Sequence, residues 1–306
     1  MPSNAPTWHS DVRVFDVFDA PADAPLDAPA GGKRGAFIGT VYLDLFPREG
    51  KYNHAAAWPV RGVSILAKGN GADRDAYRTP VSALVTNFDR KGLNHDELET
   101  MLHEFGHVLH GILSKTRYVD QAGTSVKHDF VEAPSQMFEE WARREEPLEL
   151  FRQICADCPH LSHEQIAQIE AARKWGRGLY YARQWLFAAY DMSLSTPNPD
   201  GALASWDRIE GATPLGHVAG TMFPAGFGHI VGGYAAGYYG YMWSHVLALD
   251  MLSGFHGKLL NPVDGKRYRD DILSRGGEAP PEQLVERFLG RKPTSDAFFK
   301  GITGQR

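Results

Sequence analysis

The pentapeptide His103-Glu104-Phe105-Gly106-His107 ties the chain to one kind of helix and to one kind of chemistry. Four residues make about one helical turn, so both imidazoles lie on one face of a helix and can bind the same zinc ion. Glu104 lies about 100° around the axis from His103. It is therefore poorly placed to bind the metal but well placed to act on a water molecule there. This arrangement is typical of metal-assisted hydrolysis with the glutamate as general base.

The flanking residues predict a buried helix around this motif. Asn94, with Glu97 three residues later, has the spacing of an N-terminal capping box. Apolar residues then recur at helical spacing as far as Ile112. His110 lies on the same face, but it is about 10 Å along the axis from His103, too far to share one metal. We interpret His110 as a structural histidine or as one that supports a metal ligand without binding the metal.

Two histidines need one further protein ligand to form a catalytic zinc site with an open position. The pattern HExxHxxGxxH would require glycine at position 110 and histidine at 113, where this chain has His110 and Leu113. The alternative is a glutamate from a following helix. Residues 129–141 (DFVEAPSQMFEEW) offer one, because acidic and apolar residues alternate there at helical spacing and a proline suits the first turn.

At this point the sequence resembles the thimet oligopeptidase family, which includes neurolysin, bacterial oligopeptidase A and the peptidyl-dipeptidases. The resemblance implies zinc-dependent cleavage of short peptides, with one zinc ion per chain. The matching blocks follow one another in the family's order: REGKYNHAA at 48–56, HEFGHVLH at 103–110, Gly123-Thr124, DFVEAPSQ at 129–136, FGHIVGGYAAGYYGYMW at 227–243 and RFLGR at 287–291.

The resemblance also implies roles for individual residues. The zinc ligands would be His103, His107 and Glu132, and Glu104 would be the base. The groups that face the substrate would be His229, Tyr238 and Tyr241, together with Gly232, Gly233 and Tyr234 of the same loop.

The chemistry of the residue types agrees with these roles. A peptide carbonyl under attack becomes an oxyanion, and tyrosine hydroxyls and a histidine are suitable hydrogen-bond donors to it. Glycines in the loop would let it move and approach the substrate closely. A packed aromatic segment is the alternative interpretation of residues 227–243.

The expected fold is α+β and mainly helical, with a zincin-like catalytic domain over residues 1–306. Residues 1–115 would form a small antiparallel sheet lobe with the zinc helix, and residues 116–306 a helical C-terminal lobe. Strands are predicted at 12–18, 36–46 and 82–88, and helices at 165–194, 237–252 and 281–289. Strand 82–88 could be an edge strand that pairs with an extended peptide, or an ordinary inner strand.

Composition excludes several classes of protein. The net charge of −5 and the scattered basic residues give no nucleic-acid surface. No run is long enough for a membrane helix, and residues 1–11 hold no apolar signal core. Two cysteines among 306 residues suit a reducing compartment, so the cytoplasm is the expected location.

The family's large helical region before the catalytic part has no counterpart here, so the chain is expected to be a fragment, a split subunit or a minimal enzyme. Two function classes follow. One is an active oligopeptidase on short peptides, of endopeptidase or dipeptide-releasing type. The other is an inactive or partner-dependent zinc-binding half that binds peptides without turnover.

Glu99 and Glu139 are both candidates for a carboxylate that orients a zinc-binding histidine.

Overall fold

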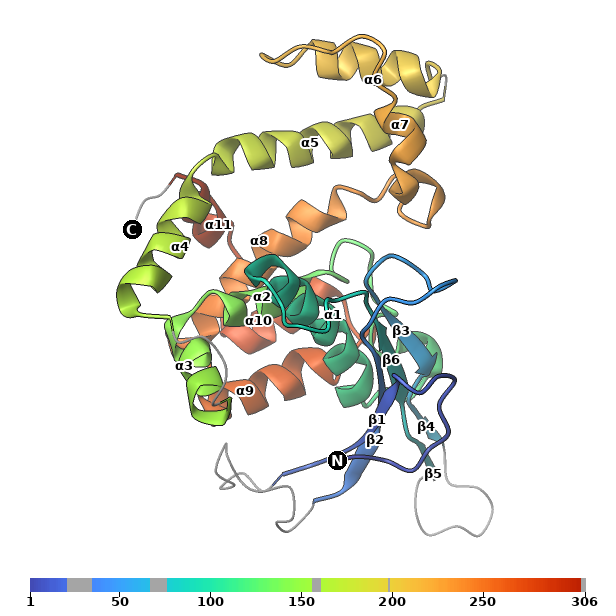
Figure 1. Ribbon diagram of the computed structural model, residues 1–306, viewed down its shortest axis with the longest axis vertical. Coiled ribbons are helices and arrows are strands. Elements are labelled where there is room, and N and C mark those ends of the chain that lie inside the picture. Colours follow the sequence, from blue (N-terminus) through green and yellow to red (C-terminus); the bar gives the residue numbers. More distant parts are fainter. Residues whose placement is uncertain (21–34, 67–75, 156–160, 198, 304–306) are drawn as a thin grey trace.

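The computed structural model describes residues 1–20, 35–66, 76–155, 161–197 and 199–303. A small sheet lies against one side of helix α1 (His95–Leu113), and most of the other helices lie on the opposite side of α1 (Figure 1). This arrangement confirms the predicted α+β, mainly helical fold. No helix in the described part of the chain is both long and apolar enough to span a lipid bilayer.

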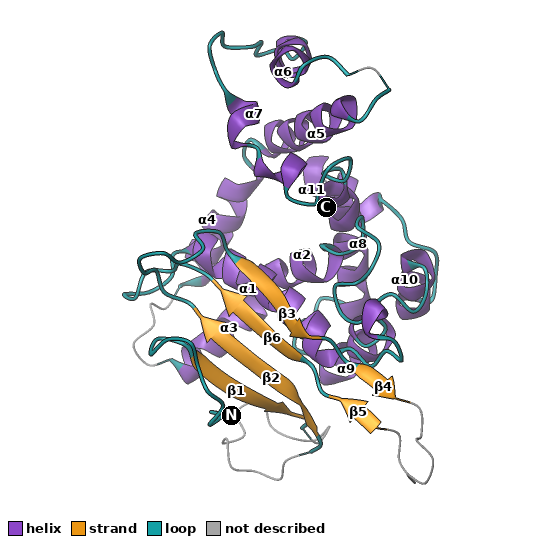
Figure 2. Ribbon diagram, turned by 90° about the vertical axis from the view of Figure 1, so that its right-hand side faces the viewer, coloured by secondary structure: helices purple, strands orange, loops and turns teal. Residues whose placement is uncertain are grey.

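The sheet has four strands in the order β1-β2-β6-β3, and a separate hairpin joins β4 and β5 (Figure 2). The prediction of an antiparallel sheet is wrong for one pair, because β2 and β6 run parallel. Strand β3 occupies the edge of the sheet, and β6 lies between β3 and β2. The strands are β1 (Arg13–Phe18), β2 (Phe37–Asp44), β3 (Ala56–Arg61), β4 (Ser64–Leu66), β5 (Ala76–Arg78) and β6 (Val81–Val85).

The predicted strand 82–88 is therefore β6, an inner strand, and β3 is the edge of the sheet next to it. The sequence analysis did not predict β3. Its proline, Pro59, removes a backbone donor and is tolerated because the strand is at an edge.

The predicted helices 237–252 and 281–289 are found at 240–252 and 281–289, whereas 165–194 is split into two helices. Gly176 has a φ of 72°, in the left-handed region that favours glycine, and it separates α4 from α5. The helices after α1 are α2 (Ala133–Glu139), α3 (Glu145–Ile154), α4 (His163–Lys174), α5 (Arg177–Leu194), α6 (Ala202–Gly211), α7 (Phe223–Gly226), α8 (Gly240–Leu252), α9 (Pro262–Tyr268), α10 (Pro281–Leu289) and α11 (Asp296–Thr303).

Helix α1 begins as its sequence predicts. The Asn94 side chain accepts a hydrogen bond from the Glu97 amide, and the Glu97 carboxylate accepts one from the Asn94 amide. On the sheet side, Val108 and Ile112 pack against Val41 and Leu84 in one buried cluster. Burial of each such side chain contributes about 1.5–3 kcal/mol, so the sheet holds α1 firmly in place.

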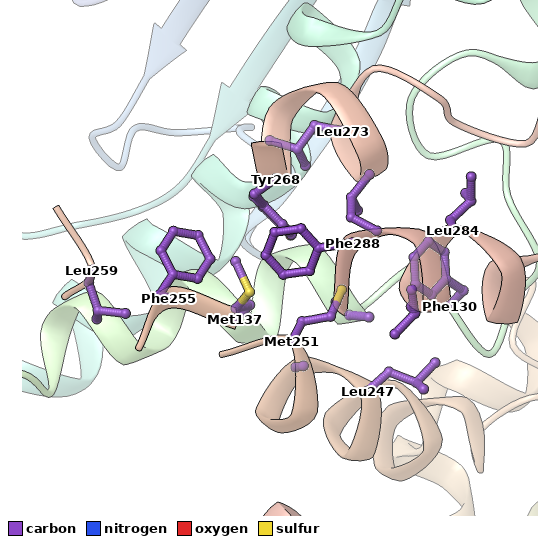
Figure 3. Close-up of a cluster of buried hydrophobic side chains, with 14 residues drawn as sticks. Phe130, Met137, Leu247, Met251, Phe255, Leu259, Tyr268, Leu273, Leu284 and Phe288 are labelled. Atoms are coloured by element: carbon purple, nitrogen blue, oxygen red, sulfur yellow. The ribbon is translucent and has the colours of Figure 1, made fainter. Parts of the chain in front are cut away.

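A second core lies on the other side of α1 and fixes the segment that follows it. Phe130 lies three residues before α2, and Met137 lies near its C-terminal end. Both pack with Met251, Phe255 and Phe288 (Figure 3). All five side chains are buried. The core therefore anchors α2 at both ends and sets the position of residue 132 relative to α1.

Candidate metal centre

Three side chains meet where α1 crosses the start of α2. His103 and His107 each direct Nε2 at the same Glu132 oxygen, Oε2, at 3.2 and 3.1 Å. One ligand atom from each of the three residues lies within 4.8 Å of the others. Glu132 is only 3% exposed. The structure therefore brings together all three residues predicted as metal ligands.

A glycine between the two histidines allows this close crossing. A Cβ on Gly106 would lie 2.6 Å from Cα of Ser135, so any larger residue would push α2 away from α1. Glu132 is the residue immediately before α2, and the Ser135 hydroxyl donates to its backbone oxygen and to its Oε2 at 2.9 and 3.1 Å. Backbone and side chain of Glu132 are thus both held.

The electrostatics of the three residues fit a bound cation. Burial by itself lowers the pKa of His103, but hydrogen bonds with Glu132 and Glu139 outweigh it and raise the pKa to about 10. For Glu132, burial is opposed by hydrogen bonds with His103 and His107, which hold its pKa well below the usual range. The space between these groups therefore stabilises positive charge. Two imidazole nitrogens and one carboxylate form a donor set that zinc accepts.

Glu104 follows His103 directly on α1, beside the candidate metal ligands. It is buried in α1, and within the described residues its carboxylate has no hydrogen bond or ion pair. A buried carboxylate with no other partner is available to take a proton from a water molecule bound nearby.

A series of ionic contacts holds the His103 ring at its Nδ1 atom. Nδ1 of His103 lies 2.9 Å from Oε1 of Glu139, and the other Glu139 oxygen accepts a hydrogen bond from Arg143 at 2.7 Å. Arg143 also donates to Glu99 and Glu140 at 2.9 and 2.8 Å. Of the two carboxylates considered from the sequence, Glu139 is the one that contacts a histidine predicted as a metal ligand.

The sequence analysis missed Arg143. In the run EEWARREE it resembles any charged residue on a solvated helix face, yet its side chain is only 9% exposed. The signal that could have revealed it is the spacing: Arg143 follows Glu139 by four residues and Glu140 by three, so the three side chains share one face.

The tyrosine loop, residues 227–239 between α7 and α8, reaches the metal centre through Tyr234. The Tyr234 hydroxyl donates to Oε1 of Glu132 at 2.7 Å. Tyr241, at the start of α8, stacks on the Tyr234 ring with centroids 5.3 Å apart. His229 packs edge-on against Tyr234, Tyr238 and Tyr241. The residues predicted to face the substrate are therefore clustered.

Tyr238 differs from the others in where its hydroxyl points. It is buried among the apolar residues of α5 and α6, and its hydroxyl donates to Oε1 of Gln184 at 3.1 Å. Gly232 and Gly233 are exposed, and Gly233 has a φ of 97°, which suits glycine alone.

Burial keeps the polar groups of this cluster uncharged. Burial, and then the negative charge of Glu132, raise the pKa of Tyr241 and of Tyr234 above the usual range. Burial likewise raises the pKa of Tyr238 to about 12 and lowers the pKa of His229. The phenols are therefore protonated at neutral pH and can donate hydrogen bonds, and the imidazole is neutral.

Asp191 of α5 anchors the loop and was also missed. Its two carboxylate oxygens accept hydrogen bonds from the amides of Ala236 and Tyr238 at 2.9 and 3.0 Å. It is 1% exposed. An acidic residue among the apolar residues of a predicted helix is the signal that could have identified it, because a buried carboxylate needs partners.

His110 has the structural position expected of it. It is fully buried, and burial, with a smaller contribution from His107, lowers its pKa to about 3. Within the described residues neither ring nitrogen has a hydrogen-bond partner. His110 is not part of the three-residue cluster at the crossing of α1 and α2.

Comparison with known proteins agrees with this geometry. The profile of the family described as "Peptidase family M3" matches residues 2–303. The chain is 35% identical to "Thimet-like oligopeptidase" of Dictyostelium discoideum and covers 43% of that protein, with 96% of this chain aligned. It is also 35% identical to "Oligopeptidase A" of Escherichia coli strain K12, again over 43% of the relative and 97% of this chain. The chain thus spans less than half the length of these relatives.

Solved structures with the same fold are more distant in sequence. The structure titled "PZ PEPTIDASE A with inhibitor 2" superposes with a TM-score of 0.55 at 16% identity, over 86% of this chain and 42% of that one. An M32 carboxypeptidase from Deinococcus radiodurans R1 gives a TM-score of 0.51 at 18% identity, over 74% and 51% of the two chains. At these identities the likeness concerns the fold alone.

Proposed function

Because this chain belongs to Peptidase family M3, we propose that it hydrolyses peptide bonds of short peptides with one zinc ion held by His103, His107 and Glu132. The observation that carries the proposal is the convergence of both imidazoles on one buried carboxylate, with Glu104 beside them on α1. Zinc bound there would supply Lewis-acid activation of water and of the peptide carbonyl.

The chain's own residues would divide the remaining work. Glu104 takes the proton from the attacking water and can return it to the leaving amine. Tyr234, Tyr241 and His229 lie close enough together to provide donors for the developing oxyanion, and the raised pKa values of the tyrosines keep those donors protonated. Tyr238 would contribute only after its hydroxyl leaves Gln184.

In this structure Tyr234 donates to a proposed metal ligand, Glu132. A loop that reaches substrate must redirect that hydroxyl, and glycines at 232 and 233 would permit the backbone change. We therefore assign Tyr241 as the first candidate for the oxyanion donor.

The test combines metal content with peptide cleavage. Purified protein should contain one zinc per chain, and it should cleave members of a panel of quenched fluorescent peptides shorter than about ten residues. A chelator should abolish cleavage, and added zinc should restore it. Cleavage that persists after the zinc has been removed would contradict the proposal.

A second candidate function is a zinc-binding half that needs a partner chain for turnover. It is supported by the apolar side chains that α4, α5 and the following loops expose, including Trp175, Leu179, Trp185, Leu215 and Val231. Exposed apolar surface of this kind is typical of an interface. Zinc binding without cleavage of any peptide in the panel would favour this candidate.

A further inference from the structure

A cavity of about 600 Å³ lies beside the metal centre, between the N-terminal half of α1 and the beginning of α5. His103, Gln136 and Tyr241 form the wall that it shares with the metal centre. The volume is in the range of small-molecule and peptide sites. A peptide whose scissile bond lies at the metal would therefore place its neighbouring residues in this cavity.

Six aspartate, glutamate and arginine side chains line the cavity, and most of them neutralise one another. Arg143 is bonded to Glu99 and Glu139, and Arg173 lies 3.0 Å from Glu99. Within the described residues, this leaves Asp96 and Arg177 with no ionic partner. Asp96 is exposed, while Arg177 is partly buried.

Arg177 is held in place without being neutralised. It is the first residue of α5, it donates to the Tyr181 hydroxyl at 3.2 Å, and its guanidinium lies 5.7 Å from the Tyr181 ring centroid. A guanidinium has five N–H donors, so most of them stay available. The first turn of α5 contains no acidic residue, and the partial positive charge of the helix end adds to that of Arg177.

We propose that this cavity is a subsite for a carboxylate of the bound peptide and that Arg177 determines that specificity. The inference rests on the proposed function, because it takes a peptide at the metal centre as its starting point. The planar guanidinium can donate two parallel N–H hydrogen bonds to the two oxygens of a carboxylate. Trp175 and Tyr180 supply apolar wall for the side chain of the same residue.

The carboxylate has two possible sources with the same chemistry. One is the free C-terminus of a peptide, which would make the enzyme release short C-terminal products. The other is an internal aspartate or glutamate side chain, which would leave the enzyme an endopeptidase with a preference for acidic residues.

The kinetic test uses peptides that differ in one group only. One pair has a free or an amidated C-terminus. The second kind of pair is amidated and has Glu or Gln at a single position, which is moved in turn through the three positions on either side of the bond. We expect the carboxylate member of one pair to have a kcat/KM on the order of 10- to 100-fold higher. Arg177→Met should remove that ratio while leaving the neutral peptide unchanged within about threefold. Arg177→Lys should keep part of the ratio, because lysine retains the positive charge but cannot donate two parallel hydrogen bonds to the carboxylate.

Lys174→Met is the matched control. Lys174 lies three residues before Arg177, is exposed, and is not part of the cavity wall, so its loss changes the net charge equally. If Lys174→Met reduces the acid-to-neutral ratio of kcat/KM as strongly as Arg177→Met does, the preference arises from the net charge of the region and the proposal is wrong. Equal kcat/KM values within both peptide pairs for the unmodified enzyme would also overturn it.

A binding measurement separates this proposal from the proposed activity. Calorimetry with the dipeptide Ala-Phe as free acid and as amide, on the zinc-loaded protein, requires no turnover. If no peptide is cleaved but the acid binds at least tenfold more tightly in an Arg177-dependent manner, the subsite stands for a C-terminal carboxylate and the activity proposal fails. If peptides are cleaved with no carboxylate preference in either pair, the activity stands and the subsite fails.

Discussion

The crossing of α1 and α2 and the tyrosine loop face the same site but are held in different ways. At the crossing, the Glu132 carboxylate is buried and bonded to both histidines, Ser135 and Tyr234. The middle of the loop, residues 231–233, is exposed, and Asp191 holds only two of the loop's amides. The metal centre is thus preorganised, whereas the groups that would meet the substrate can be rearranged. Changes at the crossing should therefore alter metal affinity, and changes in the loop should alter turnover.

The largest effect is expected at the crossing itself, for Glu132→Ala. This change removes the oxygen on which both imidazoles converge, so zinc affinity should fall by more than the roughly 10- to 100-fold typical of outer partners of a metal site. Competition with a fluorescent chelator measures the affinity. Stoichiometric zinc that survives dialysis against a mild chelator in this variant would show that the third ligand is another residue.

Glu104→Gln should separate metal binding from chemistry. Glutamine keeps the size and packing of Glu104 but cannot accept a proton, so turnover should fall by about 10² to 10⁴-fold. Zinc content should remain at one per chain, because Glu104 contacts none of the three ligands through a hydrogen bond. Near-normal kcat with normal zinc content would rule Glu104 out as the base.

The loop predicts a different pattern, tested by Tyr241→Phe and Tyr238→Phe. Loss of a direct oxyanion donor should lower kcat and kcat/KM together by about 10² to 10³-fold, with little change in KM. Tyr241 should show this fully. Tyr238 should show it only if its hydroxyl leaves Gln184 during the reaction. Zinc affinity should stay unchanged in both variants. If both retain kcat within about threefold of the parent, the cluster is packing and the donor lies elsewhere.

Arg143→Met tests the rigidity of the crossing from outside the ligand set. The change leaves Glu139 less firmly held behind His103, so zinc affinity should fall by about 10- to 100-fold. It also removes one cation each from Glu99, Glu139 and the buried Glu140, which should cost about 3–5 kcal/mol of unfolding free energy at pH 7. Arg144→Met, which removes an exposed arginine whose one carboxylate partner among the described residues is Glu140, is the control and should cost much less.

The stability difference between parent and Arg143→Met should depend on pH. Despite opposing burial, Arg143 and Arg144 lower the pKa of Glu140 from 4.5 to about 2, so in the parent this carboxylate stabilises the fold above pH 4.5. That contribution is lost as pH falls from 4.5 towards 2. Urea unfolding at pH 7, 4.5 and 3 should therefore show a difference that shrinks as pH falls. A difference independent of pH would mean that Arg143 acts through packing alone.

The sequence predicted the parts of the site that depend on local spacing. The HExxH face, the Asn94 capping box and the helix start near Glu132 are all set by residues within a few positions of one another, and helical geometry then places them. The order of the β-strands was harder to predict from the sequence. The insertion of β6 beside β2 depends on where β3 lies in space, and the short, proline-containing segment Ala56–Arg61 carries little strand pattern.

Two supporting residues were missed for a shared reason. Arg143 and Asp191 bond to groups that lie far away in the sequence, and other elements of the fold bury them. Asp191, for example, binds amides 45 and 47 positions later in the chain. A charged residue in a helix is usually solvated, so its sequence alone gives no sign of burial. Only the packing of the surrounding elements shows that these charges are enclosed and must be paired.

The smallest effect should come from Asp191→Asn, which weakens the loop's attachment without touching the metal centre. Asparagine is neutral and has one side-chain oxygen, so one of the amides of Ala236 and Tyr238 loses its acceptor and the other keeps only an uncharged one. The loop should then spend less time in the arrangement that clusters His229, Tyr238 and Tyr241, and kcat/KM should fall by roughly tenfold. Zinc affinity should be unchanged, since Asp191 contacts none of the three ligands. Asp250→Asn is the matched control: Asp250 is equally buried, but it pairs with Arg291, outside the metal centre and the loop. If Asp250→Asn lowers kcat/KM as much as Asp191→Asn, the loss reflects general destabilisation. A fall in zinc affinity for Asp191→Asn would instead show that the loop and the crossing are one rigid unit.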